Sequence, residues 1–171
     1  MIRTLTLALA GALALVCAPA SAHEAVDVYL ASLGQQPMAV GATGRPFDLV
    51  RAARRHMGAT ARDLRLPSTL WCADFVNLAR REAGLQPVPS RLARDQMRGG
   101  RIVAAATPGT IVVLSRRGGR AAAHTGIVSG VTPDGDLVVI SGNSGARDHS
   151  GARVTEAVYP RSRVIALVDP A

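Results

Sequence analysis

The sequence predicts an α+β fold in which helices pack on one face of a small antiparallel sheet. Helical patterns occupy the first part of the chain, and short apolar runs separated by Gly, Pro and Asp turns occupy the second part. Helices first and consecutive strands afterwards is the order typical of α+β domains. The chain has 171 residues, of which 48% are hydrophobic, so we expect one domain with a packed core.

The first residues, Met1–Ala22, have the pattern of a secretory signal peptide. Arg3 supplies the positive start, Leu5–Val16 the apolar run and Ala20-Ser21-Ala22 the small-residue cleavage site. The apolar run is too short for a membrane-spanning helix. Lipidation of Cys17 is an alternative, although a small residue normally precedes a lipidated cysteine. We therefore expect export to the periplasm or the extracellular space.

Two parts are expected after the signal peptide of residues 1–22. Residues 23–60 are predicted to form an N-terminal helical extension, with helices over 24–33 and 46–57. Residues 61–171 are predicted to form the domain that carries the chemistry. We find no internal repeat and no low-complexity linker in this part of the chain.

The stretch from Thr69 to Gly84 predicts a helix with a cysteine near its start. Thr69 is a plausible N-cap and Gly84 a plausible C-terminal cap. Its apolar residues recur at helical spacing, namely Trp71, Phe75, Leu78 and Ala79. Cys72 then lies in the first turn, where unpaired N–H groups and the helix dipole favour a thiolate. The alternative is a small, buried and inert hydrophobic residue.

The number of cysteines favours the reactive interpretation. The chain has two cysteines, and removal of the signal peptide would take Cys17 and leave Cys72 alone. An exported protein with one cysteine cannot form an internal disulfide, and a free thiol in an oxidising compartment is a chemical liability. This favours Cys72 as a nucleophile.

A short helix and a series of strands are predicted after Gly84. Ser90 can cap a helix over 91–98. The apolar runs predict strands over 102–104, 110–115, 123–131, 136–141, 153–158 and 163–168, with a long polar loop over 142–151.

A cysteine nucleophile needs a base within hydrogen-bond reach, and His124 is the best candidate. It opens a predicted strand in which His124, Gly126 and Val128 share one face. The alternative interpretation is a structural histidine whose polar atoms find their hydrogen bonds within the sheet.

The base in turn needs an orienting group. If the strand over 136–141 pairs with the strand of His124, Ser141 or Asn143 could hold the imidazole. The alternative for Asn143 is a plain turn residue after Gly142. His149 is a further candidate for this role, although a solvated loop histidine is the simpler interpretation.

Four blocks of sequence together carry a family resemblance. The blocks W-C-A-D-F-V-N, P-G-T-I-V-V-L-S, H-T-G-I-V-S-G and S-G-N resemble the CHAP family of cysteine- and histidine-dependent amidohydrolases and peptidases. The chain is also similar to the broader group of NlpC-like cell-wall cysteine hydrolases. The resemblance covers roughly Leu64–Val168.

The resemblance implies a papain-like fold with Cys72 as nucleophile and His124 as general base. The third polar member falls on Ser141-Gly142-Asn143. Many family members carry a glutamate where this chain has Ser141, which leaves Asn143 as the preferred orienting residue. No cofactor and no metal are implied.

The expected substrate, also from the resemblance, is an amide bond of peptidoglycan, cut by an endopeptidase or an amidase. The net charge of +8 suits an acidic cell-wall polymer. A nucleic-acid partner is disfavoured, because aromatic stacking residues and a helix-turn-helix signature are missing. We expect a monomer without a stable membrane anchor. The rival hypotheses are a non-catalytic relative that binds wall peptides or a partner, and a basic envelope protein with a structural cysteine.

Overall fold

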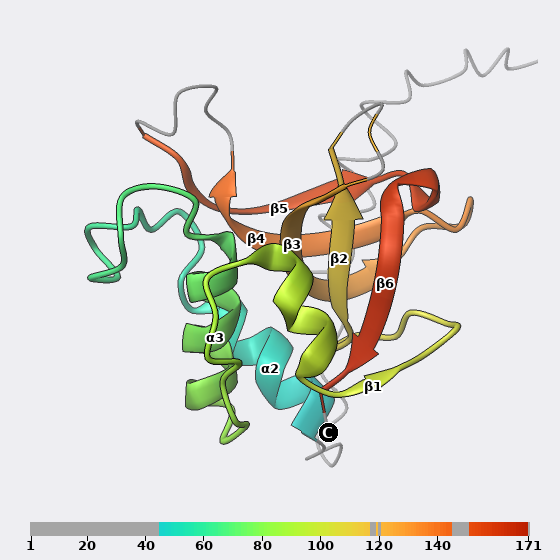
Figure 1. Ribbon diagram of the computed structural model, residues 1–171, viewed down its shortest axis with the longest axis horizontal. Helices are drawn as coiled ribbons and strands as arrows, with labels where there is room; N and C mark the ends of the chain where they lie inside the picture. Colours follow the sequence, from blue (N-terminus) through green and yellow to red (C-terminus); the bar gives the residue numbers. More distant parts are fainter. Residues whose placement is uncertain (1–44, 117–118, 120, 145–150, 171) are drawn as a thin grey trace, which may run out of the picture.

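The computed structural model describes residues 45–116, 119, 121–144 and 151–170, and it shows an α+β architecture. Two α-helices, α2 (Arg45–Arg54) and α3 (Cys72–Glu82), lie together on one side of an antiparallel sheet (Figure 1). The predictions for residues 1–22, for a helix over 24–33 and for His149 lie outside the described residues. No helix in the described part is long and apolar enough to cross a membrane.

The sheet contains six strands in the described part, in the order β1-β6-β2-β3-β4-β5, and the paired neighbours are antiparallel. The strands are β1 (Arg101–Ile102), β2 (Ile111–Ser115), β3 (Ala122–Val131), β4 (Leu137–Ser144), β5 (Arg153–Tyr159) and β6 (Val164–Asp169). This confirms the predicted order of elements. Two boundaries were wrong. The strand predicted over 102–104 covers only Arg101–Ile102, and β4 continues to Ser144, so residues expected in a loop belong to the strand.

Both faces of the sheet carry buried apolar side chains. The face toward the helices contributes Ile111, Ile127, Ile140, Val154 and Val168 to a core shared with α2 and α3. The opposite face holds a second cluster of Val112, Leu114, Val128, Leu137, Val139 and Leu167. Figure 1 shows β4 and β5 running at a steep angle to β2 and β6. A sheet that twists this strongly brings parts of its second face together, which explains a core with no helix in it.

Helix α2 belongs to the same core as the cysteine helix. Its inner side chains, Leu49, Val50, Ala52 and Ala53, are buried in the cluster that contains Trp71 and Phe75 of α3. The helix ends at Arg54, earlier than the predicted end at residue 57, and the chain turns at Gly58 with φ +79°. Glycine permits this conformation without strain.

Helix α3 ends as predicted but begins differently. Gly84 has φ +73°, and the N–H groups of Gly84 and Leu85 donate to the carbonyls of Arg81 and Arg80, which is a Schellman motif. The expected N-cap Thr69 was wrong, because the N-cap position is Trp71 and no side chain caps it. The fully buried indole of Trp71 instead sets the start of the helix.

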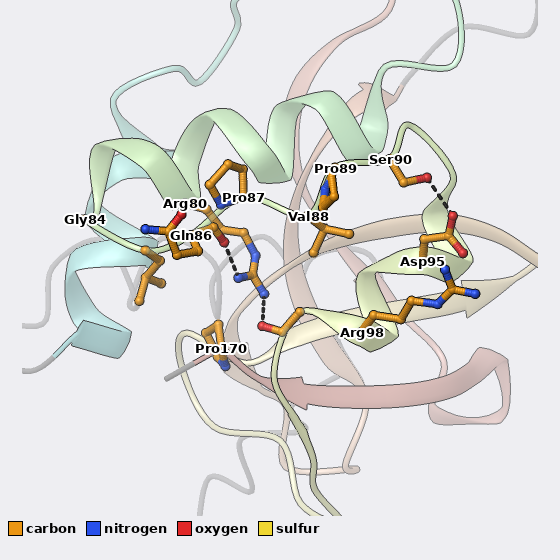
Figure 2. Close-up of a pocket in the computed structure, with 12 residues that line it drawn as sticks. Arg80, Gly84, Gln86, Pro87, Val88, Pro89, Ser90, Asp95, Arg98 and Pro170 are labelled. Atoms are coloured by element: carbon orange, nitrogen blue, oxygen red, sulfur yellow. Dashed lines mark hydrogen bonds between the residues drawn. The ribbon is translucent and has the colours of Figure 1, made fainter.

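The loop between α3 and β1 is held by buried polar side chains of α3. Asn77 Nδ2 donates to the carbonyls of Val88 and Ser90 at 2.8 and 3.2 Å, and its Oδ1 accepts from the N–H of Val88 at 2.9 Å. Arg80, 1% exposed, donates to the carbonyls of Gln86 and Gly99 (Figure 2). These bonds satisfy backbone groups that no strand pairs.

The same loop contains a short 3-10 helix, η1 (Ala93–Arg98), where an α-helix over 91–98 was predicted. Its N-cap position is Leu92, not Ser90 as predicted. Ser90 still organises the start, because its hydroxyl accepts from the N–H of Leu92 at 3.1 Å and donates to Asp95 at 2.6 Å. A second 3-10 helix, η2 (Arg161–Arg163), connects β5 to β6.

Candidate active site

Cys72 is the first residue of α3 and is 5% exposed. Three backbone N–H groups, those of Thr125, Ala73 and Cys72 itself, are directed at its sulfur and favour the thiolate. Burial is the larger effect and raises the pKa of the Cys72 thiol above its ordinary value, and the nearby Asp74 carboxylate acts in the same direction. The sulfur is therefore a neutral thiol at pH 7 in this arrangement.

Cys72 is part of the lining of a surface cleft of about 580 Å³. Its lining contains residues 91–94 of the loop after α3 and residues 121–123 at the start of β3, together with Leu70, Arg116 and Gly119. A cleft of this size is in the range that holds a small ligand or a short peptide segment. A nucleophile in its lining could meet such a ligand.

His124 lies near the start of β3, opposite Leu114 of β2. Leu114 belongs to the core cluster on the face away from the helices, and cross-strand partners share a face. The imidazole packs against Tyr159, with 5.8 Å between ring centroids, and Nε2 is buried with no hydrogen-bond partner. Burial, and then the positive charge of Arg163, lower the pKa of His124 to about 4.

The structure brings the sulfur to the backbone of β3 but not to the imidazole. Strands β3 and β4 pair only as far as Ile127 and Ile140, so the N–H of Thr125 faces the sulfur and not β4. Side chains alternate along a strand, so the ring of the preceding residue, His124, projects to the other face. Within the described residues, no hydrogen bond joins the Cys72 sulfur to this ring.

The predicted face of β3 is confirmed. Val128 lies in the same cluster as Leu114, and a Cβ at Gly126 would lie 2.5 Å from Val139 Cγ1 and 2.9 Å from Ser141 Cβ. Gly126 therefore leaves space for the neighbouring strand, so its missing side chain has a packing reason.

The two candidates for the orienting role lie at the end of β4. Ser141 is fully buried, and its hydroxyl shares a hydrogen bond of 2.9 Å with the hydroxyl of Ser144. Asn143 is half-buried and has φ +60°, a left-handed conformation that asparagine tolerates better than most residues. Asn143 therefore occupies an irregular place within the strand and not the loop that the sequence suggested.

Sequence reasoning missed three residues around these groups. Thr125 supplies an N–H to the sulfur, and Tyr159 and Arg163 surround the imidazole. Arg163 lies 5.1 Å from the Tyr159 ring centroid and donates to the carbonyl of Ser115. No local pattern signals these contacts, because they join segments far apart in the chain.

A comparison with protein families identifies a CHAP domain over residues 65–143. The matched range contains Cys72, His124 and Asn143. A search of curated proteins finds no match to the chain.

Proposed function

Because this chain belongs to the CHAP family through residues 65–143, whose members are typically peptidoglycan amidases or peptidases, we propose that it is an exported cysteine hydrolase. It cleaves an amide bond of peptidoglycan as an endopeptidase or an amidase, on a papain-like fold. The observation that carries the proposal is the position of Cys72 at the N-terminus of α3 and in the lining of an open cleft.

The proposed reaction is acyl transfer through the sulfur. His124 accepts the proton of the Cys72 thiol, and the thiolate attacks the amide carbon to form a C–S bond. The C–N bond then breaks, and the amine leaves with the proton from the imidazole. Water hydrolyses the thioester and restores the thiol. Asn143 orients the imidazole, as an amide can fix its tautomer.

This mechanism requires the imidazole to move from Tyr159 to the sulfur. His124 lies beyond the last β3–β4 pair, so its backbone is paired on one side only. Nε2 makes no hydrogen bond in its buried place, so moving the ring costs no hydrogen bond of this nitrogen. The ring contact with Tyr159 that is lost is worth about 0.5–1.5 kcal/mol. A neutral imidazole, as its low pKa implies, is also the form that can accept a proton.

A second function is favoured by the same separation. A relative that binds wall peptides without cutting them needs the cleft but not a Cys–His pair. In this chain the pKa of the Cys72 thiol is raised and the imidazole of His124 points away from the sulfur. Neither feature would impair a protein that only binds its ligand.

Digestion of purified peptidoglycan separates the two functions. We expect wild type to release fragments with new termini, and Cys72→Ser and His124→Ala to release none, with fragments identified by mass spectrometry. His56→Ala is the matched control, because His56 contacts Glu82 at the far end of α3. If wild type releases no fragment but sediments with peptidoglycan, the protein is a binder.

Export is part of the same proposal. We propose that residues 1–22 are removed as a signal peptide and that the mature, monomeric chain starts at His23. N-terminal sequencing of protein from the periplasm or culture medium tests this. An intact Met1 terminus on the exported protein would contradict it.

A further inference from the structure

His124 rests in a place that leaves one of its polar atoms unsatisfied. Its Nε2 is buried and has no hydrogen-bond partner among the residues that the structure describes. Folded proteins pair nearly all buried polar atoms, so an exception needs a physical reason. The imidazole does contact the ring of Tyr159, with 5.8 Å between the centroids and 32° between the ring planes. This ring contact is therefore an interaction that can hold the imidazole where it lies.

Tyr159 is in turn held by Arg163. The guanidinium carbon of Arg163 lies 5.1 Å from the centroid of the Tyr159 ring, within the range of a cation–π contact. Both Nε and Nη2 of Arg163 donate to the carbonyl of Ser115, at 3.1 and 2.8 Å. Two bonds to one carbonyl fix the guanidinium at the end of β2, so Tyr159 has a fixed neighbour.

The backbone around His124 allows its side chain to be redirected. The register between β2 and β3 shifts beside His124, which leaves Ala123 as an extra residue in a β-bulge. Bulges bend a strand and can change the direction of a side chain. Thr125, by contrast, is fully buried, and its hydroxyl donates to the carbonyl of Val112 at 2.9 Å. The strand is thus anchored directly after His124 and irregular directly before it.

Only a neutral imidazole suits the place beside Tyr159 and Arg163. Burial, and then the positive charge of Arg163, lower the pKa of His124 to about 4. A ring that has taken the proton of the Cys72 thiol is a cation, which Arg163 repels and the new thiolate attracts. The contact with Tyr159 therefore acts on the neutral ring, before the proton is transferred.

Resting on the proposed function for the roles of Cys72 and His124, we propose that Tyr159 and Arg163 are positioning residues that hold the imidazole away from the sulfur in the resting protein. Tyr159 holds the ring directly, and Arg163 acts by fixing Tyr159. Loss of the aromatic ring at position 159 raises the population of the arrangement in which the imidazole meets the sulfur. A contact between two rings changes such an equilibrium about 2–10-fold.

Alkylation of Cys72 by iodoacetamide tests this in the full chain and needs no substrate. The rate is followed by mass spectrometry on the peptide that contains Cys72. We expect Tyr159→Leu, which keeps an apolar side chain, to react about 2–10-fold faster than wild type at pH 7, with a rise that begins at lower pH. Tyr159→Phe is the matched control, because it keeps the aromatic ring and should react like wild type. Arg163→Gln only loosens Tyr159 and should react about 2-fold faster.

A second substitution shows whether the imidazole causes the faster reaction. His124→Ala combined with Tyr159→Leu should react no faster than His124→Ala alone. A rate that stays high without the imidazole means that Tyr159→Leu merely exposes the sulfur, which overturns the proposal. An unchanged rate in Tyr159→Leu, or an equal rise in Tyr159→Phe, overturns it as well. If Tyr159→Leu fails to fold, it reacts like the chain in guanidinium chloride, and Arg163→Gln then decides: a wild-type rate overturns the proposal.

Digestion of peptidoglycan separates this inference from the proposed function. If the alkylation rates change as expected and wild type digests nothing, the placement of the ring by Tyr159 stands and the hydrolase does not. If wild type digests peptidoglycan and the rates do not change, the hydrolase stands and the positioning role does not.

Discussion

The backbone N–H of Thr125 is directed at the sulfur of Cys72, which places the start of β3 against the N-terminus of α3. The proposed base is the very next residue toward the N-terminus, yet its side chain projects from the other face of the strand. The proposed nucleophile and base are thus neighbours through the backbone and separated through their side chains. The chemistry proposed for this protein requires the ring of His124 to reach the face of β3 on which the sulfur lies.

The thiol should react slowly in the resting protein. Burial raises the pKa of Cys72, so we expect iodoacetamide alkylation to be slow at pH 7 and to increase through and beyond about pH 9. The chain lacking residues 1–22 is used, so that Cys72 is the only thiol. The same chain in guanidinium chloride is the control and should show the ordinary thiol profile. A fast plateau below pH 7 would instead mean that a thiolate–imidazolium pair already exists.

Stability should decrease on acidification because of His124. Its pKa is about 4 when folded and 6.5 ordinarily, so between these pH values the unfolded chain binds more protons. The stability that the neutral His124 contributes is fully present above pH 6.5. It decreases as the pH falls from 6.5 to about 4, by up to about 3 kcal/mol in total. Urea unfolding at pH 7.5 and 4.5 measures it. His124→Gln should remove most of the difference, whereas His56→Gln should keep it.

Asn143 should matter for catalysis and Ser141 for stability. Asn143→Gly keeps the φ of +60° accessible but removes the amide, so we expect kcat to fall about 10–100-fold with KM little changed. Ser141→Ala loses a buried hydrogen bond to Ser144, so we expect about 1 kcal/mol of destabilisation and a normal kcat. Kinetics on a soluble wall fragment and urea unfolding check both variants. The reverse assignment of effects would make Ser141 the orienting residue.

Leu70→Asn should make the protein slightly more stable. Asparagine tolerates the φ of +51° that strains leucine, and the side chain is 62% exposed, so we expect a gain of about 0.5–1 kcal/mol. Leu92→Asn is the control: it changes a similarly exposed leucine that has φ −86°, so it should bring no gain in stability. Thermal unfolding of both variants measures the difference, and an equal melting temperature for the two would contradict the strain at Leu70.

The loop that carries Arg94 should depend on Asn77. Asn77→Ala removes the bonds to the backbone of Val88 and Ser90 and leaves those groups unpaired in a buried place. We expect about 2–4 kcal/mol of destabilisation, measured by urea unfolding. Arg81→Ala, an exposed change on the same helix, should leave the stability unchanged. An unaltered urea midpoint for Asn77→Ala would contradict this role.

Several elements were predictable because their causes are local. The apolar spacing of α3, the glycine at its C-terminal end and the alternation of β3 are each encoded within a few residues. The order of the strands along the chain followed from turn residues between apolar runs. These features depend on neighbours in sequence, which a pattern can show.

Other features had no local cause and were not predictable. Helix α3 begins at Cys72 because Trp71 packs against Phe75 and over Gly142, where a Cβ would overlap the indole ring. Tyr159 and Arg163 reach His124 because the twisted sheet brings the connection from β5 to β6 near the start of β3. Such contacts link residues separated by tens of positions, so no short pattern contains them.

The sequence by itself determined that His124 and Thr125 point to opposite faces, because side chains alternate along any strand. Only the tertiary structure decided which of those faces received the cysteine helix. That choice depends on the packing of Trp71 and Phe75 against the residues of β3 and β4, and burial of large apolar side chains outweighs any local preference of a single histidine. The fold therefore placed the sulfur beside Thr125 and left the imidazole against Tyr159 on the other face of the strand.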